Sequence, residues 1–312
     1  MRIFHVERKS KVLTPSSLAC LSHIPTINLT TGCAHGCIYC YTRGYSVYPG
    51  ENKVAFYANT FSRLRDEILR KKKRPETIYF SPSSDIFQPV PEVLELGYKV
   101  MEFLLSLKIG VAFLTKGRVP LRHMRLLCSN PNLVRAQIGL ISVNKEITKR
   151  FEPRAAAPSL RLSQAKSFVD AEITTQVRVD PVLPGITDSY DSLDGLCMEI
   201  ADAGVKRIAA SVLFLRPAIV ESLRRNLHSR QELESLLRQY EGAGRLSIHA
   251  EHSSVIALPI EARQTIYQRL RMIAEKHGLT ALLCNCKNPD LASDSCSIAG
   301  AQNEPIQRTL FS

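Results

Sequence analysis

The 312-residue sequence has no long apolar segment of the kind that membrane proteins carry, and its first residues contain no short apolar core of the kind that secretory leaders carry. No apolar run approaches the roughly 18–20 residues that a membrane-spanning helix needs. The first residues read MRIFHVERKSKV, with charges where a secretory signal would have an apolar centre. We therefore expect no signal peptide, no membrane partner and a cytoplasmic location.

The sequence also lacks low-complexity linkers, internal repeats and any extreme of overall composition. Hydrophobic residues make up 45% and charged residues 22%. These shares are ordinary for a folded domain, and they exclude disorder, collagen and coiled coil as the main architecture. A chain of this length can bury one large α/β core.

The charge balance is basic, with 41 Lys and Arg against 29 Asp and Glu and a formal charge of +12. A surplus of this sign fits nucleic acid or another anionic partner. A basic surface without a partner would have the same composition. Apart from the run KKKR at 71–74, the surplus is spread along the chain.

The nine cysteines fall into two tight groups and three isolated positions. In a reducing compartment, disulfides are disfavoured, and close spacing indicates metal or iron–sulfur ligands. The groups are Cys33, Cys37 and Cys40, and Cys284, Cys286 and Cys296, whereas Cys20, Cys128 and Cys197 stand alone.

Short apolar runs alternate with amphipathic stretches over the first two thirds of the chain. The predicted strands are 26–30, 77–81, 110–115, 134–142, 173–180 and 207–213. The predicted helices between them are 61–72, 91–107, 120–128, 159–170 and 190–203. Six βα-like units in series predict a parallel sheet with right-handed crossovers.

The pattern changes after about residue 218. One long charged helix is predicted over 219–240, a short strand over 246–249 and a helix over 260–277, followed by an irregular cysteine-bearing tail. We therefore divide the chain into an N-terminal segment (1–25), a barrel (26–218) and a C-terminal extension (219–312).

The first cysteine group lies directly after the first predicted strand, in the segment TTGCAHGCIYCY. The loop after a strand of a βα barrel lies on its catalytic face. Three thiolates leave one iron of a four-iron cluster without a protein ligand, and such an open position is typical of catalytic metal sites. Structural zinc, with His35 or a remote fourth ligand, is the alternative.

This Cys-x3-Cys-x2-Cys motif, with Tyr39 before its last cysteine, resembles the signature of the radical S-adenosylmethionine (SAM) superfamily. The segments SPSSDIFQPVP, FLTKG, FEPRAAAPSLR and VDPVLPGITDS extend the likeness in order. Together they are similar to the spore photoproduct lyase-like branch, also called DNA repair photolyase-like, over about residues 26–217.

The resemblance implies a partial (β/α)6 TIM-type barrel and a [4Fe-4S] cluster on Cys33, Cys37 and Cys40. It implies that SAM chelates the open iron and is cleaved reductively to a 5′-deoxyadenosyl radical that takes hydrogen from a substrate. It also implies an external one-electron donor of flavodoxin or ferredoxin type.

Further cofactor contacts are expected where the strands end. Lys116 ends the third strand, and burying its charge without a partner is costly, so the methionyl carboxylate is a candidate partner. Exposure to solvent is the alternative for Lys116, and loop hydrogen bonding is the alternative for the serines. The candidate SAM-binding residues are Tyr39, Tyr41, Ser84, Lys116 and Ser142, of which the resemblance supports Ser84, Lys116 and Ser142.

One position departs from the family pattern. Spore photoproduct lyase has a hydrogen-donating cysteine after its second strand, where this sequence has Pro82. The substitution argues against thymine-dimer reversal, and no catalytic residue is assigned. Asp85 is a further candidate in the same loop as Ser84. Glu152, Arg154 and Arg161 are candidates for ribose or substrate contact, with helix capping and surface ion pairs as the alternative. Arg178 and Asp180 are weaker candidates that a buried ion pair would explain equally well.

The second cysteine group, Cys284-x-Cys286-x9-Cys296, also follows an apolar run. It permits an auxiliary [4Fe-4S] cluster, with His249 or His252 as a further partner, but zinc or free structural thiols fit the motif too.

Three functions therefore remain open. The leading hypothesis is a radical SAM enzyme acting on nucleic acid or another large anionic substrate. The alternatives are radical SAM modification of a peptide or small metabolite, and a non-enzymatic, metal-stabilised nucleic-acid-binding protein.

Overall fold

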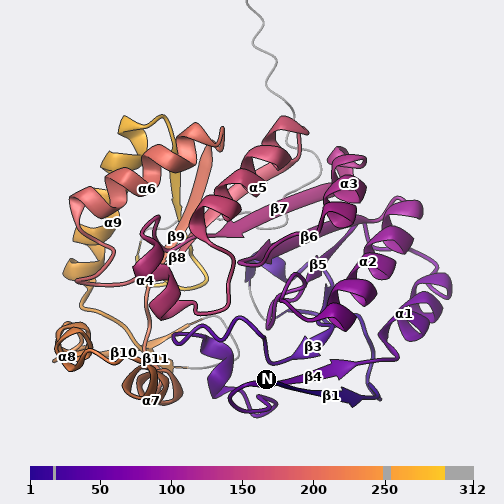
Figure 1. Cartoon of the computed structure of the whole chain (residues 1–312), viewed down its shortest axis with the longest axis horizontal. Coiled ribbons are helices and arrows are strands. Elements are labelled where there is room, and N and C mark those ends of the chain that lie inside the picture. Colours follow the sequence, from indigo (N-terminus) through magenta and orange to yellow (C-terminus); the bar gives the residue numbers. More distant parts are fainter. Residues whose placement is uncertain (17–18, 249–253, 292–312) are drawn as a thin grey trace, which may run out of the picture.

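The computed structural model describes residues 1–16, 19–248 and 254–291, and it is built around one curved parallel sheet (Figure 1). Its seven strands run in the order β12-β9-β8-β7-β6-β5-β2, and every neighbouring pair is parallel. The strands are β2 (Thr26–Ile27), β5 (Thr77–Phe80), β6 (Gly110–Thr115), β7 (Val134–Gly139), β8 (Thr174–Val182), β9 (Arg207–Val212) and β12 (Thr280–Leu283). This arrangement confirms the predicted α/β partial barrel.

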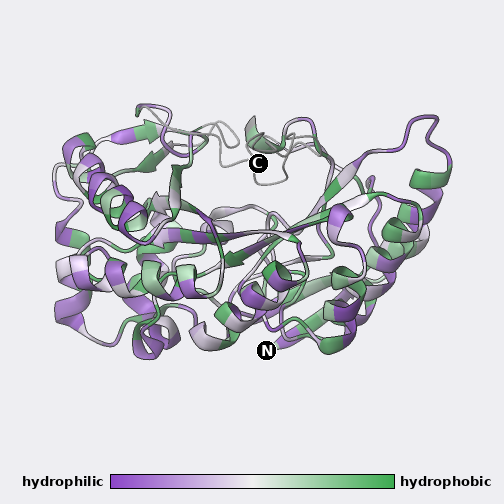
Figure 2. Cartoon of the chain, turned by 90° about the horizontal axis from the view of Figure 1, so that it is seen from above, coloured by the Kyte–Doolittle hydropathy of each residue, from purple (hydrophilic) through white to green (hydrophobic). Residues whose placement is uncertain are grey.

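Helices pack along the outer face of this sheet (Figures 1 and 2). They are α1 (Thr60–Leu69), α2 (Pro91–Ser106), α3 (Leu121–Cys128), α4 (Lys145–Phe151), α5 (Pro158–Asp170), α6 (Tyr190–Asp202) and α9 (Ile260–Lys276). Helix α2 shows why they form: Pro91 occupies its first turn, and Val93, Val100 and Leu104 bury one face. The large core therefore lies between sheet and helices, and Figure 2 shows green and purple residues mixed along each helix.

The first predicted strand divides between two sheets. Only Thr26–Ile27 pairs with the barrel, as β2, while β3 (Thr30–Thr31) pairs antiparallel with β4 (Lys53–Tyr57). The turn between them is held by Leu29, whose carbonyl accepts from Tyr57 N at 3.1 Å. Strand β1 (Arg2–Val6) completes this small sheet, which carries the chain into the cysteine loop.

The single helix predicted over 219–240 is wrong. The structure has two helices, α7 (Pro217–Asn226) and α8 (Arg230–Arg238). Leu227 is extended, and the Ser229 hydroxyl caps α8 by accepting from Glu232 N at 3.2 Å. A serine N-cap inside an apparently continuous pattern starts a new helix.

The stretch predicted as an extension also builds the sheet. Helix α9 leads into β12, which pairs parallel with β9 and adds a seventh strand. Strands β10 (Arg245–Ser247) and β11 (Ser254–Ile256) form a separate antiparallel pair. Short 3-10 helices cover Ala19–Leu21 (η1), Tyr41–Gly44 (η2) and Pro131–Leu133 (η3). The division at residue 218 stays a prediction. No helix in the described ranges is long and apolar enough to cross a membrane.

Candidate functional site

The cysteine loop begins right after β3 and depends on two glycines. Gly32 and Gly36 have φ of +77° and +67°, a conformation that other residues rarely adopt. A Cβ on Gly32 would lie 2.5 Å from Lys53 O, and one on Gly36 would lie 2.6 Å from Arg154 Nη2. Both glycines of the motif are therefore required to fold the loop closely against its neighbours.

Hydrogen bonds from other elements fix the loop backbone. Gln88 Oε1 accepts from Ala34 N at 2.8 Å, and Arg154 Nε donates to Ala34 O at 2.5 Å. The Phe151 carbonyl accepts from Ile38 N at 3.0 Å. The loop therefore takes its shape from segments 54 to 120 residues away in the sequence.

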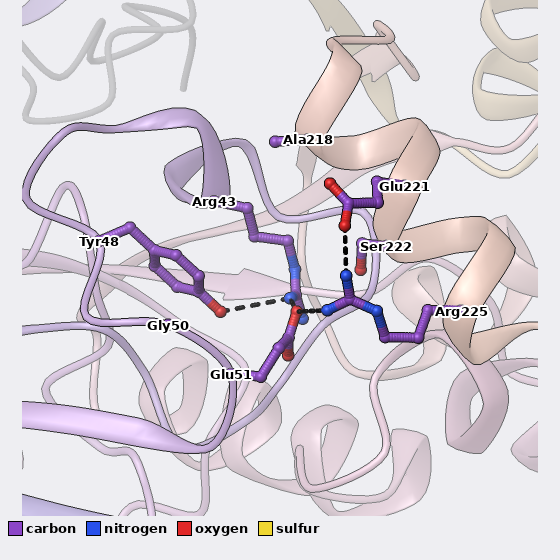
Figure 3. Close-up of a pocket in the computed structure, with 8 residues that line it drawn as sticks. All are labelled: Arg43, Tyr48, Gly50, Glu51, Ala218, Glu221, Ser222 and Arg225. Atoms are coloured by element: carbon purple, nitrogen blue, oxygen red, sulfur yellow. Dashed lines mark hydrogen bonds and ion pairs between the residues drawn. The ribbon is translucent and has the colours of Figure 1, made fainter.

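Arg43 links the loop to helix α7. Its Nε and Nη2 donate to Cys37 O at 3.1 and 3.0 Å, and its Nη1 pairs with Glu51. Arg225 on α7 also reaches Glu51, at 3.9 Å. These side chains line a cavity of about 200 Å³, together with Tyr48, Gly50, Ala218, Glu221 and Ser222 (Figure 3).

His35 and Asp85 join the cysteine loop to the ends of β5 and β6. His35 Nε2 lies 2.9 Å from Asp85 Oδ2, and His35 Nδ1 faces the Arg154 carbonyl at 3.2 Å. Asp85 also accepts from Thr115 Oγ1 at 2.8 Å and Lys116 N at 2.8 Å. Both ring nitrogens of His35 therefore have oxygen partners, which argues against His35 as a zinc ligand.

The electrostatics of Asp85 fit this structural role. Burial alone would raise the pKa of its carboxyl, but the His35 imidazole and the backbone donors of Lys116 and Phe87 lower that pKa below its usual value. Asp85 is therefore an ionised anchor for the loop. It does not lie open to a cofactor.

The three predicted ligands, Cys33, Cys37 and Cys40, are all partly exposed free thiols. Burial, with Asp85 nearby, raises the pKa of Cys33, and burial with Glu152 raises the pKa of Cys37 to about 12, although Lys116 opposes the latter shift. In the described residues, no three His, Cys, Asp or Glu side chains are arranged around a single ion position. A four-iron cluster has a different requirement, since each thiolate binds its own iron.

Lys116 lies at the end of β6, beside the cysteine loop. Its side chain is 15% exposed, and its Nζ is 3.9 Å from Glu152 Oε1. It also lies 5.9 Å from the centre of the Tyr39 ring. Gly139 makes room for it, because a Cβ there would meet Lys116 Nζ at 2.9 Å. The ammonium group is thus directed into the site, and the sequence alternative of a solvent-facing lysine is not what the structure shows.

Tyr39, Glu152 and Arg161 form a buried support behind the loop. The Tyr39 hydroxyl donates to Glu152, and Arg161 Nη2 lies 2.5 Å from Glu152 Oε2. Arg161 also donates to Gly139 O at 2.8 Å and Ala156 O at 2.6 Å. Glu152 and Arg161 therefore belong to the framework that holds Tyr39 and Gly139.

The loop after β5 contacts the cysteine loop on both sides of Ser84. The Tyr41 hydroxyl donates to Pro82 O on one side, and His35 holds Asp85 on the other. The buried hydroxyls of Ser81 and Ser84 have no hydrogen-bond partner among the described residues. Such unsatisfied groups are costly unless a ligand completes them.

Ser142 follows β7 and is buried. Its hydroxyl oxygen accepts from Asn144 N at 3.0 Å, and its carbonyl accepts from Thr148 Oγ1 at 3.3 Å. Ser142 thus shapes the start of α4 and keeps its own hydroxyl proton for another acceptor.

The second cysteine group gathers elsewhere, inside the barrel at the end of β12. Cys284 and Cys286 are buried, whereas Cys296, His249 and His252 lie outside the described residues. Cys20, which the sequence analysis set apart, reaches this group. Cys20 and Cys286 are 266 positions apart, so no local sequence pattern could indicate that they are neighbours.

Asp180 at the end of β8 holds two basic residues near these thiols. It accepts from Arg178 Nε at 3.0 Å and from Lys287 Nζ at 2.6 Å. Arg178 and Asp180 therefore form the buried ion pair that the sequence analysis weighed, with Lys287 as an unforeseen third member.

Comparison with known proteins agrees with this architecture. The family model described as the Radical SAM superfamily matches residues 27–196, more than half of the chain. Curated proteins described as uncharacterized, from Mycobacterium tuberculosis and Mycobacterium bovis, are 29% identical over 217 residues. Those matches cover 67% of this chain and 64% of the relatives' length.

Solved structures show the same fold at low sequence identity. A spore photoproduct lyase variant with bound SAM and dinucleoside spore photoproduct has a TM-score of 0.67 at 15% identity, covering 89% of this chain and 81% of that one. A radical SAM methyltransferase from Sphaerobacter thermophilus has a TM-score of 0.51 at 13% identity, covering 84% and 66%. These likenesses support the fold, and the family model supports the chemistry.

Proposed function

The chain belongs to the radical SAM superfamily, and on that premise we propose that it is a radical SAM enzyme that takes hydrogen from a nucleic-acid substrate. Membership itself implies an enzyme, a [4Fe-4S] cluster and SAM. The substrate, the ligand residues and the type of electron donor are the proposed parts. Flavodoxin or ferredoxin is the proposed class of donor.

The residues present fit this cofactor pair. Cys33, Cys37 and Cys40 would hold the cluster and leave one iron open, because the loop offers three thiols and commits His35 elsewhere. When bound, the cluster and SAM supply a 5′-deoxyadenosyl radical. The buried support of Tyr39 and Glu152 keeps the loop in place behind them.

The main support for a SAM site is that hydroxyls without hydrogen-bond partners and an inward-facing ammonium group occur at neighbouring strand ends. Ser81 and Ser84 have buried hydroxyls without described partners, and Lys116 lies close enough to Cys37 to influence its thiol. An amino-acid moiety matches this set, since its carboxylate accepts from lysine and its ammonium donates to hydroxyl oxygens. We assign Lys116 to the carboxylate and Ser84 to the amino group, while Ser142 and Tyr41 remain proposed contacts.

Tyr39 has a different proposed role from the adenosyl contact that the sequence suggested. Its hydroxyl is committed to Glu152, so we propose that it positions the loop from behind. Tyr41 is partly exposed and bridges to Pro82, which leaves its ring at the edge of the site.

Nucleic acid is the proposed substrate because two observations agree on it. The chain carries a formal charge of +12, and the fold is shared with a spore photoproduct lyase solved with dinucleoside spore photoproduct. The exposed run at 71–74 precedes β5, so it lies at the strand end opposite the cysteine loop. We therefore propose that substrate contact lies on the side of the barrel where the strands end, and assign no such role to that run.

The test is anaerobic reconstitution followed by turnover with a chemical reductant. We expect about four irons bound at the first site and SAM cleavage to 5′-deoxyadenosine and methionine. Fully loaded protein that does not cleave SAM would contradict the enzymatic proposal.

The substrate class is tested separately with deuterated candidates. Deuterium should appear in 5′-deoxyadenosine with oligonucleotides, and binding should weaken steeply with salt. Transfer from peptides or small metabolites, with no response to nucleic acid, would favour the alternative substrate class instead.

A further inference from the structure

Three cysteines from opposite ends of the described chain meet inside the barrel. The Cys20 amide donates to Cys286 Sγ at 3.4 Å, and the Cys286 thiol interacts with the thiols of both Cys20 and Cys284. Cys20 belongs to η1, shortly before β2, while Cys284 and Cys286 follow β12. Since β2 and β12 are the two edge strands of the sheet, the thiols meet across the open side of the barrel.

Apolar side chains pack around these thiols, and two N–H donors point at their sulfur atoms. Leu21, Ile24, Tyr79, Ala112 and Ala209 pack around them. Arg178 Nη2 donates to Cys284 Sγ at 3.6 Å, in addition to the Cys20 amide on Cys286. N–H donors directed at sulfur are a feature of iron–sulfur sites.

We propose that Cys20, Cys284 and Cys286 hold a second iron–sulfur cluster that joins the two edges of the barrel. Thiolate sulfur is a soft ligand suited to zinc or iron–sulfur clusters. In a four-iron cluster each of the three thiolates would bind its own iron. Each thiol loses its proton on binding iron, and no redox change of the cysteines is involved.

This ligand set differs from the one that sequence spacing suggested. Spacing alone grouped Cys284 and Cys286 with Cys296, whereas the contacts bring in Cys20 from the N-terminal segment. The consequence is structural: the cluster connects the segment before β2 to the segment after β12. Its binding energy would then contribute to holding the barrel edges together.

The test counts iron and sulfide in protein that lacks the first site. The Cys33→Ala, Cys37→Ala, Cys40→Ala variant should retain about four irons, against about eight in the unmodified chain. Adding Cys20→Ser or Cys286→Ser should reduce this remainder to nearly none. Cys128→Ser and Cys197→Ser are the matched controls, since these cysteines lie on α3 and α6, and each should retain about four irons.

A second measurement guards against misfolding and separates this proposal from the proposed function. Cys20→Ser in the otherwise unmodified chain should still load about four irons and cleave SAM, which shows a folded first site. If the Cys20→Ser variant keeps all of its second-site iron while Cys296→Ser loses it, the ligand set is wrong. One zinc per chain in place of iron, or no metal beyond the first site, would overturn the second cluster.

Discussion

The imidazole of His35 and the carboxylate of Asp85 lie 2.9 Å apart and connect the cysteine loop to the barrel. His35 stands between Cys33 and Cys37, and Asp85 also accepts from the Lys116 backbone amide. The Asp85 carboxylate thus holds two parts of the site in place. One is the cysteine loop, which we propose binds the cluster, and the other is the end of β6, which we propose binds SAM. The relationship explains why an acidic residue follows Ser84.

We expect Asp85→Asn to destabilise the metal-free protein by about 1–3 kcal/mol at pH 7. The asparagine NH2 group would face the hydroxyl and backbone N–H donors that the carboxylate now accepts from, and at least one of them would lose its partner. The native pKa of Asp85 is lowered, so its stabilisation is present above the unfolded-state pKa of about 4 and is lost as pH falls through the native value. The difference between variant and wild type should therefore shrink on acidification. Urea unfolding at a series of pH values measures it.

The control for this variant is Asp170→Asn. Asp170 pairs with Lys166 on the exposed face of α5, where both side chains are 60% exposed. Its removal should change the free energy of unfolding by less than about 0.5 kcal/mol. Equal effects of the two substitutions at pH 7 would contradict the anchoring role of Asp85.

Each of the substitutions Cys33→Ala, Cys37→Ala and Cys40→Ala should abolish SAM cleavage and remove the iron of the first site. Alanine offers no ligand, and a four-iron cluster with two thiolates is poorly held. Iron counting and the release of 5′-deoxyadenosine measure the two effects. Cys128→Ala and Cys197→Ala, on helices away from the loop, should retain both properties. Full iron content with turnover in Cys37→Ala would refute the ligand assignment.

Lys116→Ala should weaken SAM binding roughly tenfold to a hundredfold while the first cluster stays in place. The physical reason is the loss of a charge-assisted hydrogen bond of about 1.5–3 kcal/mol. Equilibrium binding to the reconstituted protein measures the dissociation constant. Lys166→Ala, on the exposed face of α5, is the matched control. An unchanged dissociation constant for Lys116→Ala would contradict its proposed pairing with the SAM carboxylate.

The sequence predicted those parts of the fold that depend on residues close together in the chain. Strands β5 to β9 are apolar runs bounded by turn residues, and the cysteine motif carries its own spacing. The break at Leu227 was missed because helical periodicity continues across it, although Ser229 is a recognisable cap. Strand β4 was missed too, since its pairing with β1 joins segments about 50 residues apart.

The candidate site shows the same division between local and distant information. The cysteines, Lys116 and Ser84 could be named from strand ends, but their support could not. Glu152 reaches Tyr39 across 113 residues, and Cys20 reaches Cys286 across 266. Such contacts depend on how the barrel closes, which no local pattern encodes.

Gly139→Ala should disturb SAM binding through Lys116, without touching SAM itself. A Cβ at this position would meet Lys116 Cγ at 2.8 Å and Nζ at 2.9 Å, so the lysine side chain must move. We expect a weaker effect than that of Lys116→Ala, on the order of threefold to tenfold in the dissociation constant, because flexible side chains adjust in part.

The double variant decides whether the effect acts through the lysine. Once Lys116 is alanine, adding Gly139→Ala should cost little more, since residues in contact give non-additive effects. Gly195→Ala is the control: it lies within α6 with no atom within 4 Å of the new Cβ, and it should leave SAM binding unchanged. Fully additive losses in the double variant would mean that Gly139 acts by another route, through its carbonyl contact with Arg161.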